Sequence, residues 1–195
     1  MDENTPKDTI NAPVRRKRRY DPSRRERIIA VTLEAIELYG ITGTSTRKVA
    51  EMADVSLGSL TYYFEGINQL IEEAFTQLSL SISNEFRDVL GAAKTREEAL
   101  IAVVDFIDQK IWGSHSTLTL SFELYTFVTR HPQLKSLPQS WMKQSRAALE
   151  QHFTPATARV IDAFVEGIGI HNYFDREPMT RTEIERVIRL IASAE

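Results

Sequence analysis

The segment from Ser45 to Phe64, STRKVAEMADVSLGSLTYYF, constrains the fold most, because it fits a helix, a turn and a second helix into twenty residues. Thr46 is placed to cap the first helix and Ser56 to cap the second. Between the two helices, Asp54, Val55 and Ser56 form the turn. Leu60 and Phe64 lie four residues apart, so they share the buried side of the second helix. The segment therefore predicts a helix-turn-helix.

The composition limits the class of protein. With 195 residues and 42% hydrophobic content, the chain can bury one good core or two small ones, and we expect two unequal domains. The absence of cysteine excludes disulfides, thiolate metal sites and thiol nucleophiles, and it favours a reducing compartment. No apolar run approaches the roughly 18 residues of a membrane span, and the N-terminus lacks a secretion signal. We therefore expect a soluble, cytoplasmic protein with no membrane partner.

Basic charge is concentrated near the N-terminus, although the net charge is only -3. Residues 13–27 hold eight Lys and Arg against Asp21 and Glu26, whereas residues 67–195 carry 13 basic and 17 acidic side chains. A solvated arm and a nucleic-acid contact are both compatible with such a basic run. Its position just before the helix-turn-helix favours contact with a polyanion.

A first helix is predicted to precede this motif. Ser23 with Glu26 indicates a capping box, and the helix runs to Tyr39, where Gly40 ends it. Two arginines, Arg24 and Arg25, occupy the first turn, where the helix dipole disfavours cations and phosphate contact would resolve the conflict. The predicted buried stripe comprises Ile28, Val31, Thr32, Ala35, Ile36 and Tyr39.

Several short motifs recur together in a fixed order: Arg27-Ile28-Ile29 leading to Tyr39-Gly40, Thr46-Arg47-Lys48-Val49-Ala50, Val55 to Leu60, and Tyr63-Phe64. In this order and spacing they resemble the DNA-binding domain of the TetR family of bacterial repressors, over about residues 23–75. The resemblance implies a sequence-specific regulator, normally a repressor, that binds a palindromic operator on double-stranded DNA as a homodimer. A small-molecule effector releases such a protein, which is cytoplasmic and associates with the nucleoid when bound to DNA.

Three positions depart from the family pattern. Asp54 stands where the family has Gly in the turn, so it must adopt a left-handed or otherwise open backbone, which Asp tolerates moderately. Thr61 replaces a Tyr and Ile67 replaces a Lys, and some phosphate contacts are therefore missing. The basic arm from Arg15 to Arg19 is placed to supply the lost charge, along the backbone or in the adjacent minor groove.

On this resemblance, the DNA surface comprises the two helices of the motif and the basic side chains before them. Three side chains are expected to hold phosphates: Thr46, Arg47 and Tyr63. Three are placed to reach base edges or thymine methyl groups: Ser59, Thr61 and Tyr62. The alternative for either tyrosine is packing in the small domain's core. The full predicted set is Arg15, Arg16, Lys17, Arg18, Arg19, Arg24, Arg25, Thr46, Arg47, Leu57, Gly58, Ser59, Thr61, Tyr62 and Tyr63.

From Ile67 onward, apolar residues follow the helical period with no strand-like alternation. The predicted helices of this region span about 67–90, 95–113, 114–131, 134–153, 155–172 and Thr180 to the end. Thr95 with Glu98 and Thr180 with Glu183 form predicted capping boxes, and two other helices are predicted to start at Ser114 and at Thr154-Pro155. The predicted fold is all-α with about nine helices. We expect a flexible basic arm over residues 1–20, a three-helix DNA-binding domain over 21–66, and a helical effector-binding and dimerisation domain over 67–195.

The last two predicted helices are the expected dimer interface. In TetR-like proteins, the two terminal helices of each subunit form a four-helix bundle, so the resemblance implies a homodimer. A twofold dimer places two recognition helices about 34 to 36 Å apart, as a palindrome requires. The predicted interface residues are Ile161, Phe164, Val165, Ile168, Ile184, Val187, Ile188 and Ile191.

The C-terminal domain is also expected to hold the effector, as in the family. An aromatic-rich set of side chains with several polar groups suits a small, partly apolar ligand, although core packing is the competing interpretation for each aromatic ring. The predicted set is Phe86, Phe106, Trp112, Phe122, Glu123, Tyr125, Thr126, Trp141, Ser145, Arg146 and His171.

Two other functions compete with a DNA-binding regulator. An enzyme or metal protein would need its histidines, but these form no close helical pair and no HExxH, GxSxG or phosphate-loop motif occurs. We therefore predict no catalysis, no metal and no cofactor. The other alternative is a TetR-like helical sensor that has lost DNA binding, which Thr61, Ile67 and the acidic overall charge would favour.

Overall fold

The computed structural model describes residues 21–108 and 114–194. Within these ranges every regular element is a helix and no strand occurs, so the predicted all-α fold is confirmed. The elements are α1 (Arg24–Gly43), α2 (Thr46–Met52), α3 (Leu57–Tyr63), α4 (Ile67–Ala92), α5 (Arg96–Asp108), α6 (His115–Arg130), the short 3-10 helix η1 (Pro132–Leu134), α7 (Ser136–Leu149), α8 (Pro155–Phe174) and α9 (Arg181–Ala192).

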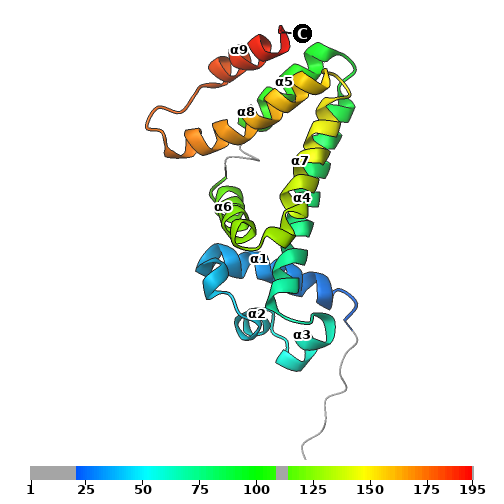
Figure 1. The fold of residues 1–195 in the computed structure, drawn as a ribbon, viewed down its shortest axis with the longest axis vertical. Helices are drawn as coiled ribbons and strands as arrows, with labels where there is room; N and C mark the ends of the chain where they lie inside the picture. The colour runs from blue at the N-terminus through cyan, green and yellow to red at the C-terminus, as the bar shows by residue number, and fades with distance from the viewer. Residues whose placement is uncertain (1–20, 109–113, 195) are drawn as a thin grey trace, which may run out of the picture.

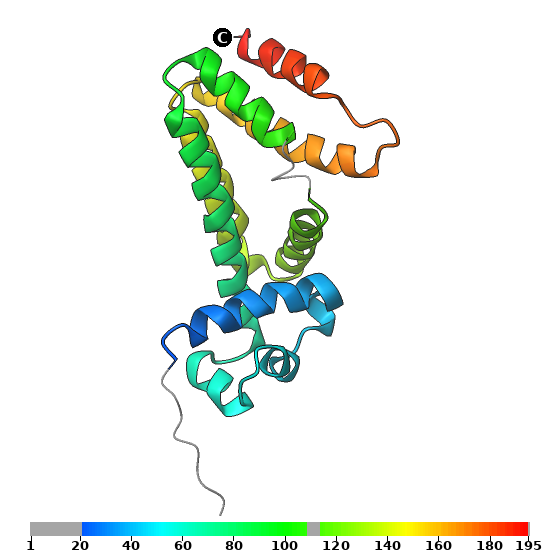
Figure 2. The same ribbon diagram turned by 180° about the vertical axis from the view of Figure 1, so that it is seen from behind.

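The helices form two groups joined by one long element. Helices α1, α2 and α3 gather at one end, and α5, α8 and α9 gather at the other (Figure 1). Helix α4 runs between the two groups with α7 alongside it, and α6 lies next to α1, as the view from behind confirms (Figure 2).

Local signals account for the helix-turn-helix. The Ser45 hydroxyl accepts a hydrogen bond from Lys48 N at 3.2 Å, and the Ser56 hydroxyl accepts one from Ser59 N at 3.2 Å. The predicted cap at Ser56 is therefore confirmed, whereas Thr46 is the first helical residue and Ser45 caps α2. Asp54 has a φ of 50°, the left-handed conformation expected of it.

The start of α1 differs from the predicted capping box. The Ser23 backbone N–H and hydroxyl both donate to Asp21 Oδ1, at 3.2 and 2.9 Å, so the serine side chain caps no helical N–H. Farther along, Tyr39 is 47% exposed and lies outside the buried stripe. The stripe ends one turn earlier, at Ile36, which is fully buried.

Gly40 breaks α1 rather than ending it. Its φ of 67° and ψ of 169° are accessible to glycine but strained for other residues, and the helix resumes for residues 41–43. Glu123 from α6 sits at the break, where its Oε2 accepts a hydrogen bond from Ile41 N at 2.9 Å. A Cβ at position 40 would lie 3.1 Å from Glu123 Oε1. The break is therefore a docking point for α6.

Helix α4 contributes to two hydrophobic cores. Leu70 and Ala74 pack in the core of α1, α2 and α3, together with the fully buried Leu60 and Phe64. Phe75 and Phe86 pack in the larger core formed by the other helices. The two cores meet along the first turns of α4, where Leu70 and Ala74 pack in one core and Ile71 and Phe75 pack in the other.

Most predicted caps of the C-terminal helices are present. The hydroxyls of Ser114, Thr154 and Thr180 accept hydrogen bonds from the backbone three residues ahead, and Thr180 with Glu183 forms a full capping box. At α5, the Thr95 hydroxyl accepts a hydrogen bond from Glu98 N at 3.1 Å. The Glu98 carboxylate accepts from Lys94 N rather than from Thr95 N, so the capping box is incomplete.

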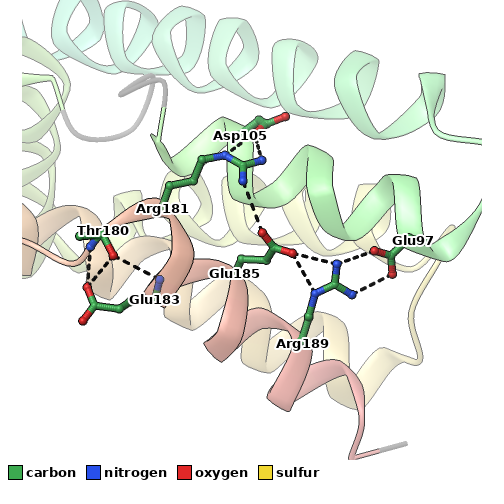
Figure 3. Close-up of polar contacts among 7 residues, drawn as sticks. All are labelled: Glu97, Asp105, Thr180, Arg181, Glu183, Glu185 and Arg189. Carbon is green, nitrogen blue, oxygen red and sulfur yellow. Dashed lines mark hydrogen bonds and ion pairs between the residues drawn. The ribbon is translucent and has the colours of Figure 1, made fainter.

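A network of charges fixes α9 on α5 (Figure 3). Arg189 bonds Glu97 with Nη2 to Oε1 at 2.5 Å, and it also bonds Glu185. Arg181 donates a hydrogen bond to Asp105 at 2.6 Å and another to Glu185, the carboxylate that Arg189 also contacts. The hydrogen bond from Arg189 lowers the pKa of Glu97. The two arginines therefore join α9 to α5, while the buried Ile184 and Ile188 determine which face of α9 packs on the core.

Gly40→Ala is expected to destabilise the protein by about 1–3 kcal/mol, because alanine is strained at this φ and ψ and its Cβ crowds Glu123. Thermal or urea unfolding measures the change. Gly91→Ala is the control, since a Cβ there meets no atom within 4 Å and the substitution lies in a helix, where alanine is favoured. Equal stability of the two variants would contradict this role of Gly40.

Candidate nucleic-acid interface and ligand pocket

Helix α3 presents an open face whose opposite side is anchored in the core. Leu60 and Phe64 are 0% and 1% exposed. The remaining positions are exposed or half-buried, and these are the six side chains predicted to face outward: Leu57, Gly58, Ser59, Thr61, Tyr62 and Tyr63. The structure therefore brings the six together on one short helix, as its spacing predicts.

The two tyrosines have different environments. Tyr62 is 82% exposed, so packing in the core is excluded for it. Tyr63 is half-buried: Tyr62 meets it edge-on at 5.1 Å between ring centroids, and Tyr63 lies 6.3 Å from Phe64. The Thr61 hydroxyl donates to the carbonyl of Leu57 at 3.2 Å, which leaves its oxygen able to accept only.

Helix α2 adds cationic groups to the same surface. Arg47 is exposed and forms no hydrogen bond or ion pair with any part of the chain that the structure describes. Thr46 beside it is half-buried. The Lys48 ammonium lies 4.8 Å from the centroid of the Tyr39 ring, a cation–π contact. Sequence analysis missed this pair, since the contact joins two helices and Tyr39 is predicted as core.

The arginines at the start of α1 are partly covered by the rest of the chain, with 22% of the Arg24 side chain and 43% of the Arg25 side chain exposed. Arg25 donates to Glu73 of α4, and its guanidinium lies 5.2 Å above the Phe64 ring. Arg24 is half-buried, with Nε 4.0 Å from Asp21 Oδ2. Carboxylates of the protein therefore offset the conflict with the helix dipole, and the phosphate contacts of both arginines stay predictions. Residues Arg15 to Arg19 lie outside the described residues.

A small pocket, with a cavity volume of about 40 Å³, lies among α4, α5, α6, α7 and α8 in the larger core. Five predicted effector residues line it: Phe86, Phe106, Tyr125, Trp141 and Ser145. The Phe86 and Phe106 rings pack at 4.6 Å between centroids. The other lining residues are Ile82, Pro138, Met142, Asp162 and Glu166. The pocket is thus an aromatic box with two carboxylates on α8.

The carboxylates make defined contacts. Asp162 accepts a hydrogen bond from Arg146 Nε at 2.9 Å, and Glu166 accepts one from the Tyr125 hydroxyl. Burial raises the pKa of Asp162, while Arg146 opposes the shift. Burial, and then the bond to Glu166, raise the pKa of Tyr125, so its hydroxyl stays protonated and keeps donating. Sequence analysis missed both acids, although their i,i+4 spacing in an apolar helix is a usable signal.

The remaining predicted effector residues lie elsewhere. Glu123 docks on the break in α1, and Arg146 reaches the pocket only through Asp162. Phe122 is 39% exposed, and Thr126 and His171 are exposed on the surface, since these positions fall on the outer faces of α6 and α8. Trp112 lies outside the described residues.

The predicted dimer residues fall mostly on the inner faces of α8 and α9. Four are buried within the single chain, so they lack surface to offer a partner: Ile161, Ile168, Ile184 and Ile188. Four are half-buried: Phe164, Val165, Val187 and Ile191. The large apolar side chains that α8 and α9 expose are Val160, Tyr173, Phe174 and Leu190, which are 51%, 43%, 67% and 61% exposed. The stripes predicted as an interface are therefore mainly the core side of the two helices.

Comparison with known proteins identifies the family. Residues 28–74 match the model of bacterial regulatory proteins of the tetR family. SCO7518 of Streptomyces coelicolor A3(2), described as a transcriptional regulator, is 44% identical, with 88% of this chain and 99% of that chain covered and a TM-score of 0.83. This chain belongs to the TetR family. It is a helix-turn-helix transcriptional regulator and not an enzyme.

Two further proteins are similar to this chain over most of its length. The HTH-type transcriptional regulator BetI of Ectopseudomonas mendocina is 26% identical over 85% of this chain and 90% of that protein. The multidrug binding protein EbrR, in complex with ethidium, is 28% identical over 87% of this chain and 98% of that chain, with a TM-score of 0.71. Both cover the C-terminal helices as well as the DNA-binding ones.

Membrane-spanning helices and metal-binding clusters are both absent from the residues that the structure describes. No helix there is both long and apolar enough to cross a bilayer. No group of three or more histidine, aspartate or glutamate side chains in the described ranges is arranged to hold a metal ion.

Proposed function

We propose that this TetR-family protein is a repressor that binds a palindromic operator as a homodimer and is released by a small aromatic cation. The observation that carries the proposal is the path of α4, which packs against the DNA-reading group through Leu70 and lines the pocket through Phe86. In the cell, we place the protein in the cytoplasm, and on the nucleoid when it holds its operator.

The DNA contacts follow from the open face of α3. With this helix in the major groove, Ser59, Thr61 and Tyr62 reach base edges, whereas Arg47 and Lys48 hold the backbone. The remaining contacts in this proposal are Thr46, Leu57, Gly58 and Tyr63. Residues Arg15 to Arg19 supply cationic charge that α3 lacks.

Deleting residues 1–19 is expected to weaken binding to an operator fragment and to reduce the salt dependence of binding. Each lost phosphate contact lowers the slope of log affinity against log salt by about 0.9. The fragment is selected from the source genome with the full-length protein, and binding is measured by fluorescence anisotropy at several salt concentrations. An unchanged slope would contradict a role for the arm, and failure to enrich any palindrome would contradict the main proposal.

The dimer interface is proposed on the outer faces of α8 and α9. Val160 and Leu190 expose large apolar side chains there, and half-buried Phe164 lies on the same side of α8 as Val160. Ile184 and Ile188 of α9 are buried in the core, which leaves Leu190 on the open side of the helix. A twofold axis through this surface would pack α8 and α9 against the same two helices of a second subunit.

Leu190→Glu is expected to yield folded monomers that bind the operator weakly, because the charge enters the proposed interface without disturbing the core. Sedimentation and circular dichroism measure assembly and folding. Ile188→Glu should instead unfold the chain, since Ile188 is 0% exposed. Leu80→Glu, at an exposed leucine of α4, is the control and should leave a dimer. A dimeric Leu190→Glu protein would contradict this interface.

The chemistry of the pocket favours a cationic, aromatic effector. Aromatic rings provide stacking surfaces, and Asp162 and Glu166 provide two carboxylates, of which Asp162 is bonded to Arg146. EbrR is described as a multidrug binding protein in complexes with ethidium, proflavin and malachite green, which are organic cations. Its similarity to this chain supports the same class of ligand.

Proflavin is expected to bind the protein, and Glu166→Gln is expected to weaken that binding about tenfold, as for loss of one charge-assisted contact. Proflavin fluorescence measures the affinity. Glu150→Gln is the control, because Glu150 is exposed and outside the pocket. Equal affinity of the Glu166→Gln and wild-type proteins would contradict a cation site at this carboxylate.

A further inference from the structure

A chain of polar contacts holds the end of the recognition helix α3. The backbone N–H of Glu65 donates to Gln69 Oε1 at 2.7 Å, and Gln69 Nε2 donates to Glu73 Oε1 at 3.1 Å. Arg25 donates to the other oxygen of Glu73, and its guanidinium covers the Phe64 ring. We call Arg25, Gln69 and Glu73 the head clamp. It joins α1, the end of α3 and the first two turns of α4.

Helix α3 depends on such external contacts for its position. It has seven residues, a length at which a helix has little stability of its own in water. Within α3 only Leu60 is buried, and the next residue with a buried side chain is Phe64, which ends the helix. Phe64 and Glu65 are the two residues that the head clamp contacts. The direction of α3 therefore depends on how firmly the clamp holds its C-terminal end.

The head clamp also lies on the helix that reaches the pocket. Glu73 and Phe86 are both on α4, thirteen residues apart, which corresponds to about 20 Å along the helix axis. A shift of α4 at the pocket would thus move Gln69 and Glu73 together, and the clamp would transfer that movement to the end of α3.

We propose that Arg25, Gln69 and Glu73 are positioning residues that hold α3 at the angle required to read DNA, and that Arg25 acts through Glu73 and Phe64 rather than on a phosphate. The inference rests on the DNA-binding function. It assigns an acidic residue, Glu73, a favourable role in binding a polyanion.

The sign of one substitution separates positioning from simple electrostatics. Removing the carboxylate of Glu73 removes negative charge from the DNA-binding group, so electrostatics alone predicts tighter binding. Positioning predicts weaker binding, because Arg25 and Gln69 lose their shared acceptor. For Arg25, the slope of log affinity against log salt concentration separates a phosphate contact from a positioning contact. Loss of a phosphate contact lowers this slope by about 0.9, whereas loss of a positioning contact leaves it unchanged.

The experiment uses the full-length protein and the genomic fragment selected with it. Glu73→Ala and Arg25→Gln are each expected to bind about tenfold more weakly, the loss of one charge-assisted hydrogen bond, with an unchanged salt slope. Glu85→Gln and Arg87→Gln make matched charge changes at exposed positions of α4 remote from the clamp and should bind as the wild type does. Equal or tighter binding by Glu73→Ala, or a lower slope for Arg25→Gln, would overturn the proposal.

Hydrogen exchange tests the clamp without DNA. In Glu73→Ala, the amides of Leu60 and Phe64 should exchange faster than in the wild type, while those of Val49 and Ala53 in α2 and the turn keep their rates. Glu73→Gln keeps a side-chain oxygen that can accept from Arg25 or Gln69, so it should exchange more slowly than Glu73→Ala. Unchanged exchange in Glu73→Ala would overturn the proposal even if no operator is found, so failure of the clamp and failure of DNA binding are distinguishable.

Discussion

The structure depends on one continuous helix that is buried in two cores. Helix α4 packs Leu70 and Ala74 against α1, α2 and α3, and it packs Phe75 and Phe86 against the C-terminal helices. Because packed interiors transmit displacement rather than absorb it, a change in the pocket that moves α4 must also move its first turns. A displacement of α4 therefore reaches both the aromatic pocket and the DNA-reading face, although the two share no residue.

A second connection runs through α6. Its Glu123 accepts from Ile41 N at the break in α1, and its Ser116 donates to Glu37 of α1 at 2.7 Å. Tyr125, on the same helix, lines the pocket. Helix α6 therefore holds the end of α1 next to α2, while α4 holds the end of α3. A ligand that separates α6 from α4 would act on the helix-turn-helix from both sides, which is why the glycine at position 40 matters beyond local strain.

How much could be predicted from the sequence depended on the range of each interaction. Caps at Ser56 and Thr180 involve partners three residues away, and they were predicted correctly from local pattern. The partner of Arg25 lies 48 residues away on α4, so the same arginine was interpreted as a phosphate contact. Periodicity identified Ile188 as apolar and buried, but it cannot distinguish packing in the chain's own core from packing on a second copy. The aromatic half of the pocket was predictable from composition, whereas Asp162 and Glu166 required the fold to bring α8 beside α6 and α7.

Thermodynamic linkage tests the coupling between pocket and DNA surface most directly. Proflavin affinity is measured for the free protein and for the protein saturated with its operator fragment, and operator affinity is measured with and without proflavin. The account predicts that each ligand weakens the other by the same factor, in the range of about 5- to 150-fold for a typical allosteric protein. Proflavin binding that is identical in the free and DNA-bound proteins would contradict the claim that α4 joins the two sites.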